Sequence, residues 1–200
     1  MSALQKKAIY GSALFNTTAN NQEGHSMLPE LSGLWDKLEV RRREMLALIE
    51  QLTPEQIRFR LEPDRWSILQ VLQHVVMGEE GMRRSEDELR NNPLREILQP
   101  GKMVQVVKEV LEKDVPVDLP DPSMAPDGKT TLDELRATWH EERRAMAAPL
   151  ETVTAQNRER VMFSHLAAGP LTALQMLEIA VAHLDTHRRQ IDRICKELPA

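Results

Sequence analysis

The sequence predicts an all-α protein, a four-helix bundle with a long proline-rich crossover between its second and third helices. Two observations carry this. Only seven of the 200 residues are aromatic and only eight are glycine, which disfavours a β-rich fold, whereas the strong helix formers Ala, Leu, Glu, Arg and Met dominate. Four long segments also repeat apolar residues at intervals of three and four, the spacing of one helix face.

The first bundle helix is expected to begin at Leu28. Its apolar positions are spaced by three, four or seven residues until Pro54 ends or redirects the helix: Leu31, Leu34, Leu38, Met45, Leu48 and Leu52. Residues 1–27 lack this periodicity and are interpreted as a flexible N-terminal arm. The bundle domain is therefore expected to span residues 28–198.

A capping box, Ser67 with Gln70, predicts the start of a second helix that runs to about Arg90. The crossover then covers residues 91–130, which hold six of the twelve prolines. Within it, residues 102–113 predict a short amphipathic helix, and residues 115–128 predict a long surface loop. The apolar stripe of the short helix must pack on the bundle or on a partner: Val106, Val107, Val110 and Leu111.

Two further capping boxes predict the remaining helices, Thr131 with Glu134 and Thr172 with Gln175. The last helix carries an unbroken core seam that includes one polar residue, His187, between Leu184 and Ile191. Arg41 and Glu142 occupy comparable seam positions in the first and third helices. Either these two point to solvent as the helices drift from a strict repeat, or they join His187 in a polar cavity.

Composition excludes several classes of protein. The net charge of −5 disfavours nucleic-acid binding, which usually requires a basic surface. A single cysteine cannot form an internal disulfide, and no apolar run is long enough to span a membrane. The N-terminus lacks a signal peptide's apolar core. A cytoplasmic protein that binds neither nucleic acid nor membranes is expected.

His183 and His187 lie four residues apart, on one face of the last helix. Two imidazoles at this spacing can bind one metal ion, but no glutamate follows the first histidine, so the metalloprotease motif is incomplete. The spacing alone leaves open a metal site or two histidines without one. A third ligand would come from His74, in the second helix, or from His165, before the last helix; His25 and His140 lack supporting context.

Two motifs resemble the DinB/YfiT-like superfamily. The first runs from Trp66-Ser67-Ile68 to His74, with Glu79 five residues further on. The second begins at His165, continues through Gly169-Pro170-Leu171-Thr172 and Gln175, and ends with His183, His187, Gln190 and Ile191. The resemblance implies a four-helix bundle, often a homodimer, with a divalent metal ion held by His74, His183 and His187.

The resemblance further implies a metal-dependent hydrolase or a transferase of a small thiol, acting on a small-molecule substrate. Three histidines would leave the ion an open coordination position and suit Zn, Ni or Fe. Glu79, Asp185 and Gln190 are candidates for orienting the imidazoles. Five arginines could bind a carboxylate-bearing thiol: Arg41, Arg42, Arg43, Arg188 and Arg189. The alternative is a dimeric metal-binding or stress-associated bundle without turnover.

Overall fold

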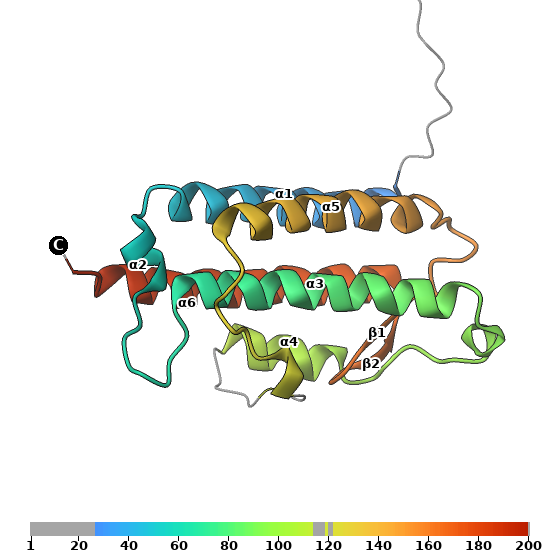
Figure 1. Ribbon diagram of the computed structural model, residues 1–200. Helices are drawn as coiled ribbons and strands as arrows, with labels where there is room; N and C mark the ends of the chain where they lie inside the picture. Colours follow the sequence, from blue (N-terminus) through green and yellow to red (C-terminus); the bar gives the residue numbers. More distant parts are fainter. Residues whose placement is uncertain (1–26, 114–118, 120–121, 200) are drawn as a thin grey trace, which may run out of the picture.

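Four long helices form two layers in the computed structural model, which describes residues 27–113, 119 and 122–199. One layer contains α1 (Pro29–Ile49) and α5 (Leu132–Glu151), and the other contains α3 (Ile68–Arg90) and α6 (Ala173–Lys196) (Figure 1). Helix α1 packs on α6, α5 packs on α3, and α3 contacts α6. The core lies between the layers, where Met45 and Trp139 are fully buried. The predicted all-α four-helix bundle is confirmed.

Capping boxes set the starts of the helices. The side chains of Ser67, Thr131 and Thr172 each accept a hydrogen bond from the backbone three residues on, as the sequence predicted. Thr53 forms a fourth box at the start of the short helix α2 (Pro54–Arg58), which was not predicted. Each box satisfies backbone N–H groups that a helix end would otherwise leave unpaired.

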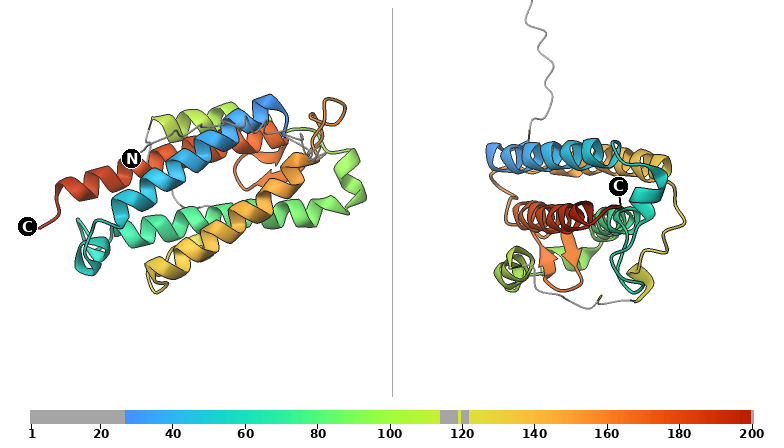
Figure 2. Two further views of the ribbon diagram at one scale, coloured as in Figure 1. Left: turned by 90° about the horizontal axis from the view of Figure 1, so that it is seen from above. Right: turned by 90° about the vertical axis from the view of Figure 1, so that its left-hand side faces the viewer.

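A third layer covers the outer face of α3 and α6 (Figure 2). It contains α4 (Val104–Glu112), which packs on α6, and an antiparallel hairpin of β1 (Phe163–His165) and β2 (Gly169–Leu171), in which Phe163 pairs with Leu171. Two 3₁₀ turns accompany them, η1 (Pro93–Glu96) and η2 (Pro122–Met124). The sequence did not predict the hairpin, because three-residue strands are too short to show an alternating pattern of apolar and polar residues.

Helix α4 is the short amphipathic helix that the sequence predicted in the crossover. Val107 and Leu111 pack against the core, whereas Val106 is 48% exposed. The hydroxyl of Thr186 and the guanidinium of Arg189, both on α6, donate hydrogen bonds to the carbonyl of Leu111 at 2.7 and 2.9 Å. Much of the stripe therefore covers the bundle itself, and the homodimer stays a prediction.

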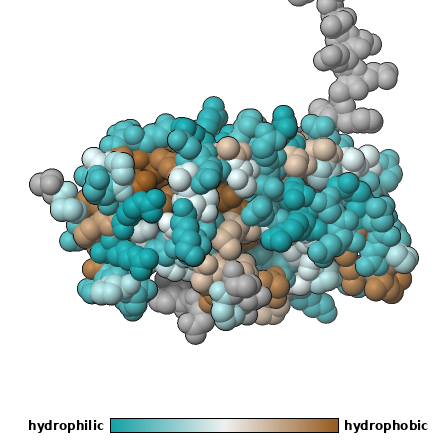
Figure 3. Space-filling view, viewed as in Figure 1, coloured by the Kyte–Doolittle hydropathy of each residue, from teal (hydrophilic) through white to brown (hydrophobic). Residues whose placement is uncertain are grey.

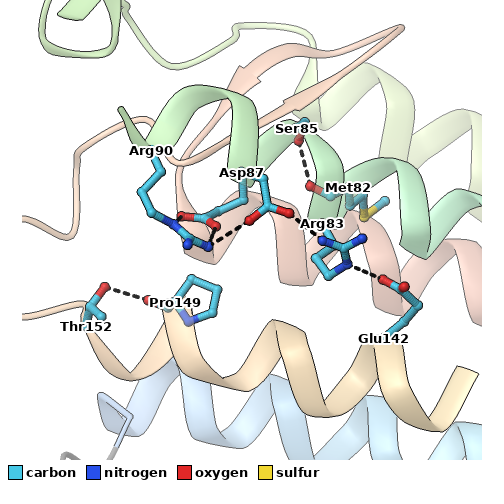
Figure 4. A network of polar contacts seen from close by, with 9 residues as sticks. Met82, Arg83, Ser85, Asp87, Arg90, Glu142, Pro149 and Thr152 are labelled. Atoms are coloured by element: carbon cyan, nitrogen blue, oxygen red, sulfur yellow. Dashed lines mark hydrogen bonds and ion pairs between the residues drawn. The ribbon is translucent and has the colours of Figure 1, made fainter. Parts of the chain in front are cut away.

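The two polar residues predicted in the core seams of α1 and α5, Arg41 and Glu142, differ in their exposure to solvent. Arg41 is exposed and pairs with Asp185 at 2.7 Å. Glu142 does not point to solvent, because its carboxylate accepts a 2.5 Å hydrogen bond from Arg83 on α3. Arg83 also pairs with Asp87, which in turn pairs with Arg90, so an ion-pair network joins α3 to α5 (Figure 4). Both seam residues are thus paired with an oppositely charged side chain, Arg41 with Asp185 and Glu142 with Arg83.

A second ion pair between α3 and α5 lies inside the bundle. Arg143 donates hydrogen bonds to both oxygens of Glu79 at 2.5 and 2.6 Å. The two side chains are only 5% and 9% exposed, and the guanidinium lies over the rings of Trp35 and Trp139. Burying both charges requires this close pairing, because either charge alone would lose its hydration without compensation.

The surface is predominantly hydrophilic on the face shown in Figure 3. The exposed large apolar side chains include Leu94 and Ile97 near η1 and Leu166 in the hairpin turn. Among the described helices, none combines the length and apolar character needed to cross a membrane. The predicted arm 1–27 lies outside the described residues except for Met27, as does much of the first part of the predicted 115–128 loop.

Candidate metal centre

Three imidazoles from two helices converge between α3 and α6. The Nε2 atom of His183 lies 3.2 Å from Nε2 of His74 and 3.0 Å from Nε2 of His187. One nitrogen from each ring can be chosen so that all three lie within 4.8 Å of one another. The histidines that the sequence singled out therefore share one point, although 109 residues separate His74 from His183.

Helix geometry explains the convergence. His183 and His187 are one turn apart on α6, so their rings project from the same face. His74 reaches them from α3, which packs against α6. Gly78, one turn after His74, provides space, because a Cβ at this position would lie 3.5 Å from Cε1 of His183. A side chain larger than alanine here would press on that ring.

Burial favours the neutral form of His74 and His183. It lowers the pKa of His74 from 6.5 to about 4, with a further lowering by His187, while the backbone of Met124 acts in the opposite direction. Burial also lowers the pKa of His183, and the neighbouring histidines add to the effect. Neutral imidazoles retain the lone pair with which histidine binds a metal ion.

The outer ring nitrogens indicate how two of the rings are oriented. Nδ1 of His187 lies 2.9 Å from Oε1 of Gln190. Because a carbonyl oxygen can only accept, Nδ1 is the donor in this hydrogen bond, and Nε2 is the nitrogen turned toward the cluster. Nδ1 of His74 is buried without a hydrogen bond of ordinary geometry among the described residues. The ring of Trp66 lies beside His74, with 4.9 Å between the centroids.

This donor set fits a metal ion. Three nitrogens at about 2.0–2.1 Å from a tetrahedral zinc ion are about 3.3 Å from one another, close to the two Nε2–Nε2 separations of 3.2 and 3.0 Å. Each ring nitrogen carries at most one proton or one lone pair, so hydrogen bonds among the three rings cannot satisfy both contacts of the central Nε2 of His183 fully. A cation bound by nitrogen would resolve that conflict.

Comparison with known proteins identifies the family. The sequence profile of the DinB superfamily matches residues 37–191, more than three quarters of the chain. The chain belongs to the DinB superfamily. Comparison with curated proteins finds no match.

Two solved structures share this DinB fold. The first is described as "YfiT from Bacillus subtilis is a probable metal-dependent hydrolase with an unusual four-helix bundle topology"; it is 18% identical, with a TM-score of 0.55 over 86% of this chain and 90% of that one. The second, "TT2238, a four-helix bundle protein", is 16% identical, with a TM-score of 0.51 over 80% and 97%. At these identities the likeness concerns the fold.

Two of the three residues expected to orient the imidazoles have other partners in this DinB chain. Both oxygens of Glu79 accept hydrogen bonds from Arg143, and Asp185 pairs with Arg41 at the surface. Each carboxylate therefore forms a charge-assisted pair with an arginine, and a role of Glu79 and Asp185 in orienting the imidazoles stays a prediction. Gln190, by contrast, contacts His187 directly.

The remaining histidines lie outside the cluster. Nδ1 of His165, at the end of β1, accepts hydrogen bonds from the backbone N–H groups of Ala167 and Ala168 at 3.2 and 3.1 Å. Burial lowers the pKa of His165. His140 is exposed on α5, and His25 lies outside the described residues.

The predicted basic residues do not surround the three histidines. Arg41, Arg188 and Arg189 line a groove of about 640 Å³ between α1 and α6, together with Glu44 and Asp185. Arg42 and Arg43 instead donate hydrogen bonds to Glu39. None of the cluster histidines lines this groove.

Proposed function

We propose that this DinB chain binds one divalent metal ion through His74, His183 and His187 and uses it in an enzyme reaction on a small molecule. The observation that carries the proposal is the approach of three imidazole nitrogens at 3.2 and 3.0 Å between two helices. The description of YfiT as a probable metal-dependent hydrolase supports it.

The reaction we propose is hydrolysis or transfer to a low-molecular-weight thiol. Three neutral ligands leave the full charge and an open position on a divalent ion, which lowers the pKa of a bound water or thiol. The chain's own residues orient the ligands. Oε1 of Gln190 accepts a hydrogen bond from Nδ1 of His187, and the ring of Trp66 lies beside that of His74. Nitrogen donors suit Zn, Ni or Fe.

The setting we propose is a cytoplasmic homodimer that binds neither nucleic acid nor membranes. The net charge of −5 supports the absence of a nucleic-acid partner. The family resemblance supports the dimer and the low-molecular-weight thiol.

One observation favours the alternative, a dimeric metal-binding or stress-associated bundle without turnover. His74 and His187 are only 8% and 9% exposed. No cluster histidine is among the described residues that line the groove between α1 and α6 or the smaller one beside Leu28 and Val153. A substrate would have to reach a centre whose ligands are largely covered.

Metal analysis of protein purified without an affinity tag tests the metal site. We expect about one divalent ion per chain, and loss of most of it in His74→Ala, His183→Ala and His187→Ala, with helical circular dichroism largely retained. The exposed His140→Ala serves as the matched control and should retain the metal. Retention of the metal in all three ligand variants would disprove the assignment.

Activity assays on the loaded protein separate the two functions. Thiol consumption with an electrophilic probe would indicate a transferase, and hydrolysis of activated esters or amides would indicate a hydrolase. Loaded protein that turns over neither class would support the bundle without turnover.

A further inference from the structure

The groove between α1 and α6 is separate from the candidate metal centre. The two helices pack side by side (Figure 2), and the groove between them has a volume of about 640 Å³, within the range of small-molecule sites. On α6 it uses another face than the histidines do. His187 meets His74 of α3, whereas Arg188 and Arg189, each about 100° further round the helix, line the groove toward α1.

Positive charge is in excess along the lining of the groove, although the chain as a whole has a net charge of −5. The lining contains three arginines and two carboxylates: Arg41, Arg188, Arg189, Glu44 and Asp185. Arg41 pairs with both carboxylates, at 3.3 and 2.7 Å. Neither carboxylate of the lining is therefore paired with the two arginines of α6, and an anion would be attracted to that side of the groove.

Arg188 keeps the outer fork of its guanidinium free. Its Nε donates to Asp192 at 3.0 Å, and neither Nη1 nor Nη2 has a hydrogen-bond partner among the described residues. In the other two arginines of the lining one Nη is already used, Nη1 in Arg41 and Nη2 in Arg189. The side chain of Arg188 is 31% exposed, so a ligand can reach the fork. Two such N–H groups match the two oxygens of a carboxylate.

The α1 side of the groove adds apolar surface. Ala47 and Leu48 both line it, and Ala47 is exposed while Leu48 is half-buried. A hydrocarbon chain that covered these two side chains would be removed from water together with them, which favours binding. A ligand suited to both sides of the groove is therefore anionic at one end and apolar at the other.

We propose that the groove between α1 and α6 binds a small aliphatic monocarboxylate. Its carboxylate lies on the Nη1–Nη2 fork of Arg188, and its hydrocarbon chain lies on Ala47 and Leu48. A single negative charge suits a lining in which arginines outnumber carboxylates by one. Because no cluster histidine lines the groove, the inference goes beyond the function proposed above and does not depend on it.

Titration of the intact protein with hexanoate tests the site, followed by the backbone amide shifts in ¹H–¹⁵N spectra. We expect saturable shifts concentrated in residues 41–51 and 185–189. Hexanamide keeps the chain without the charge, and acetate keeps the charge without the chain. Each should bind more weakly than hexanoate, hexanamide by about tenfold or more because it loses a charge-assisted contact.

Substitutions then assign the contact. Arg188→Gln removes the fork and should weaken hexanoate binding by about tenfold or more. Arg144→Gln is the matched control, because Arg144 also pairs with a carboxylate of its own helix, that of Glu141, but lies on α5; its affinity should equal that of the wild type. Ala47→Glu places a carboxylate at an exposed position of the groove and should also weaken binding.

Equal hexanoate affinities in Arg188→Gln and the wild type would overturn the inference. So would hexanamide binding as tight as hexanoate binding, because the carboxylate would then have no specific partner. Absence of saturable shifts in residues 41–51 and 185–189 would also overturn it. If Arg188→Gln does not fold, Arg188→Lys takes its place, since it keeps the charge and removes the fork, and it too should bind hexanoate more weakly.

Discussion

The buried pair of Glu79 and Arg143 offers a sharp test of what holds the bundle together. Glu79→Gln keeps the shape of the side chain but removes its charge. Arg143 would then remain inside the bundle at 5% exposure without its counterion. Its remaining acidic neighbour, Glu39, lies 3.6 Å away and cannot replace two hydrogen bonds of 2.5 and 2.6 Å.

The expected loss is large because the pair is almost fully shielded from water. Removing one member of a buried ion pair costs about 3–5 kcal/mol in the free energy of unfolding. At a urea dependence of about 2 kcal/mol per molar, the unfolding midpoint would fall by about 2 M. Replacing both residues, Glu79→Leu with Arg143→Met, removes the stranded charge, and stability should recover to within about 1 kcal/mol of the wild type or exceed it.

Urea unfolding followed by circular dichroism measures these changes. Glu141→Gln is the matched control, because Glu141 pairs with Arg144 on the same helix at 58% and 73% exposure, where such pairs contribute about 0–1 kcal/mol. The metal content of folded Glu79→Gln should equal that of the wild type. If Glu79→Gln lowers the free energy of unfolding by less than about 1 kcal/mol, the reasoning about burial is refuted. If the variant loses metal while it stays folded, Glu79 does support the metal-binding histidines.

Three further predictions concern the site and its supports. The pKa of His74 falls from 6.5 to about 4 on folding, so between these two pH values the unfolded chain binds more protons than the folded one. The metal-free protein should therefore lose about 3 kcal/mol of stability as the pH drops from 6.5 to 4. Urea unfolding midpoints measured across that range should fall less steeply in His74→Leu than in the wild type. Gly78→Leu should displace the His183 ring and reduce the metal content. Gly81→Leu, whose side chain would meet open space on the same helix, should not. Equal metal contents in the two variants would contradict the proposed packing. Gly101→Ala would place a Cβ 2.0 Å from the carbonyl oxygen of Ala168 and should lower the melting temperature, whereas Gly33→Ala, with nothing nearby, should leave it unchanged or raise it.

Most of the helical architecture could be predicted because its signals are local. A hydroxyl followed three residues later by Gln or Glu specifies a helix start regardless of the rest of the chain, and α3, α5 and α6 begin where those pairs predicted. Helix α2 and the hairpin were missed because segments of five and three residues are too short for a periodic signal.

The candidate site was predictable only in part. The spacing of His183 and His187 places both rings on one helix face, but the position of His74 relative to them depends on how α3 packs against α6, which the residue pattern alone does not encode. That link came from the family resemblance. The partner of Glu79 was unpredictable for a similar reason: Arg143 is 64 residues away, and in sequence it resembles any charged residue on an exposed helix face.

The contact between α1 and α6 has a consequence for how the protein is made. Helix α1 packs on α6, the last of the described helices to be synthesised, so the apolar face of α1 lacks this partner until α6 has been made. His74 on α3 is synthesised well before its two partners on α6, because His183 follows it by 109 residues. At a synthesis rate of about 5–20 residues per second, the nascent chain would expose this surface for several seconds. A product that ends before α6 would lack two of the three histidines as well as the helix that covers α1, which would leave it a substrate for chaperones and proteases.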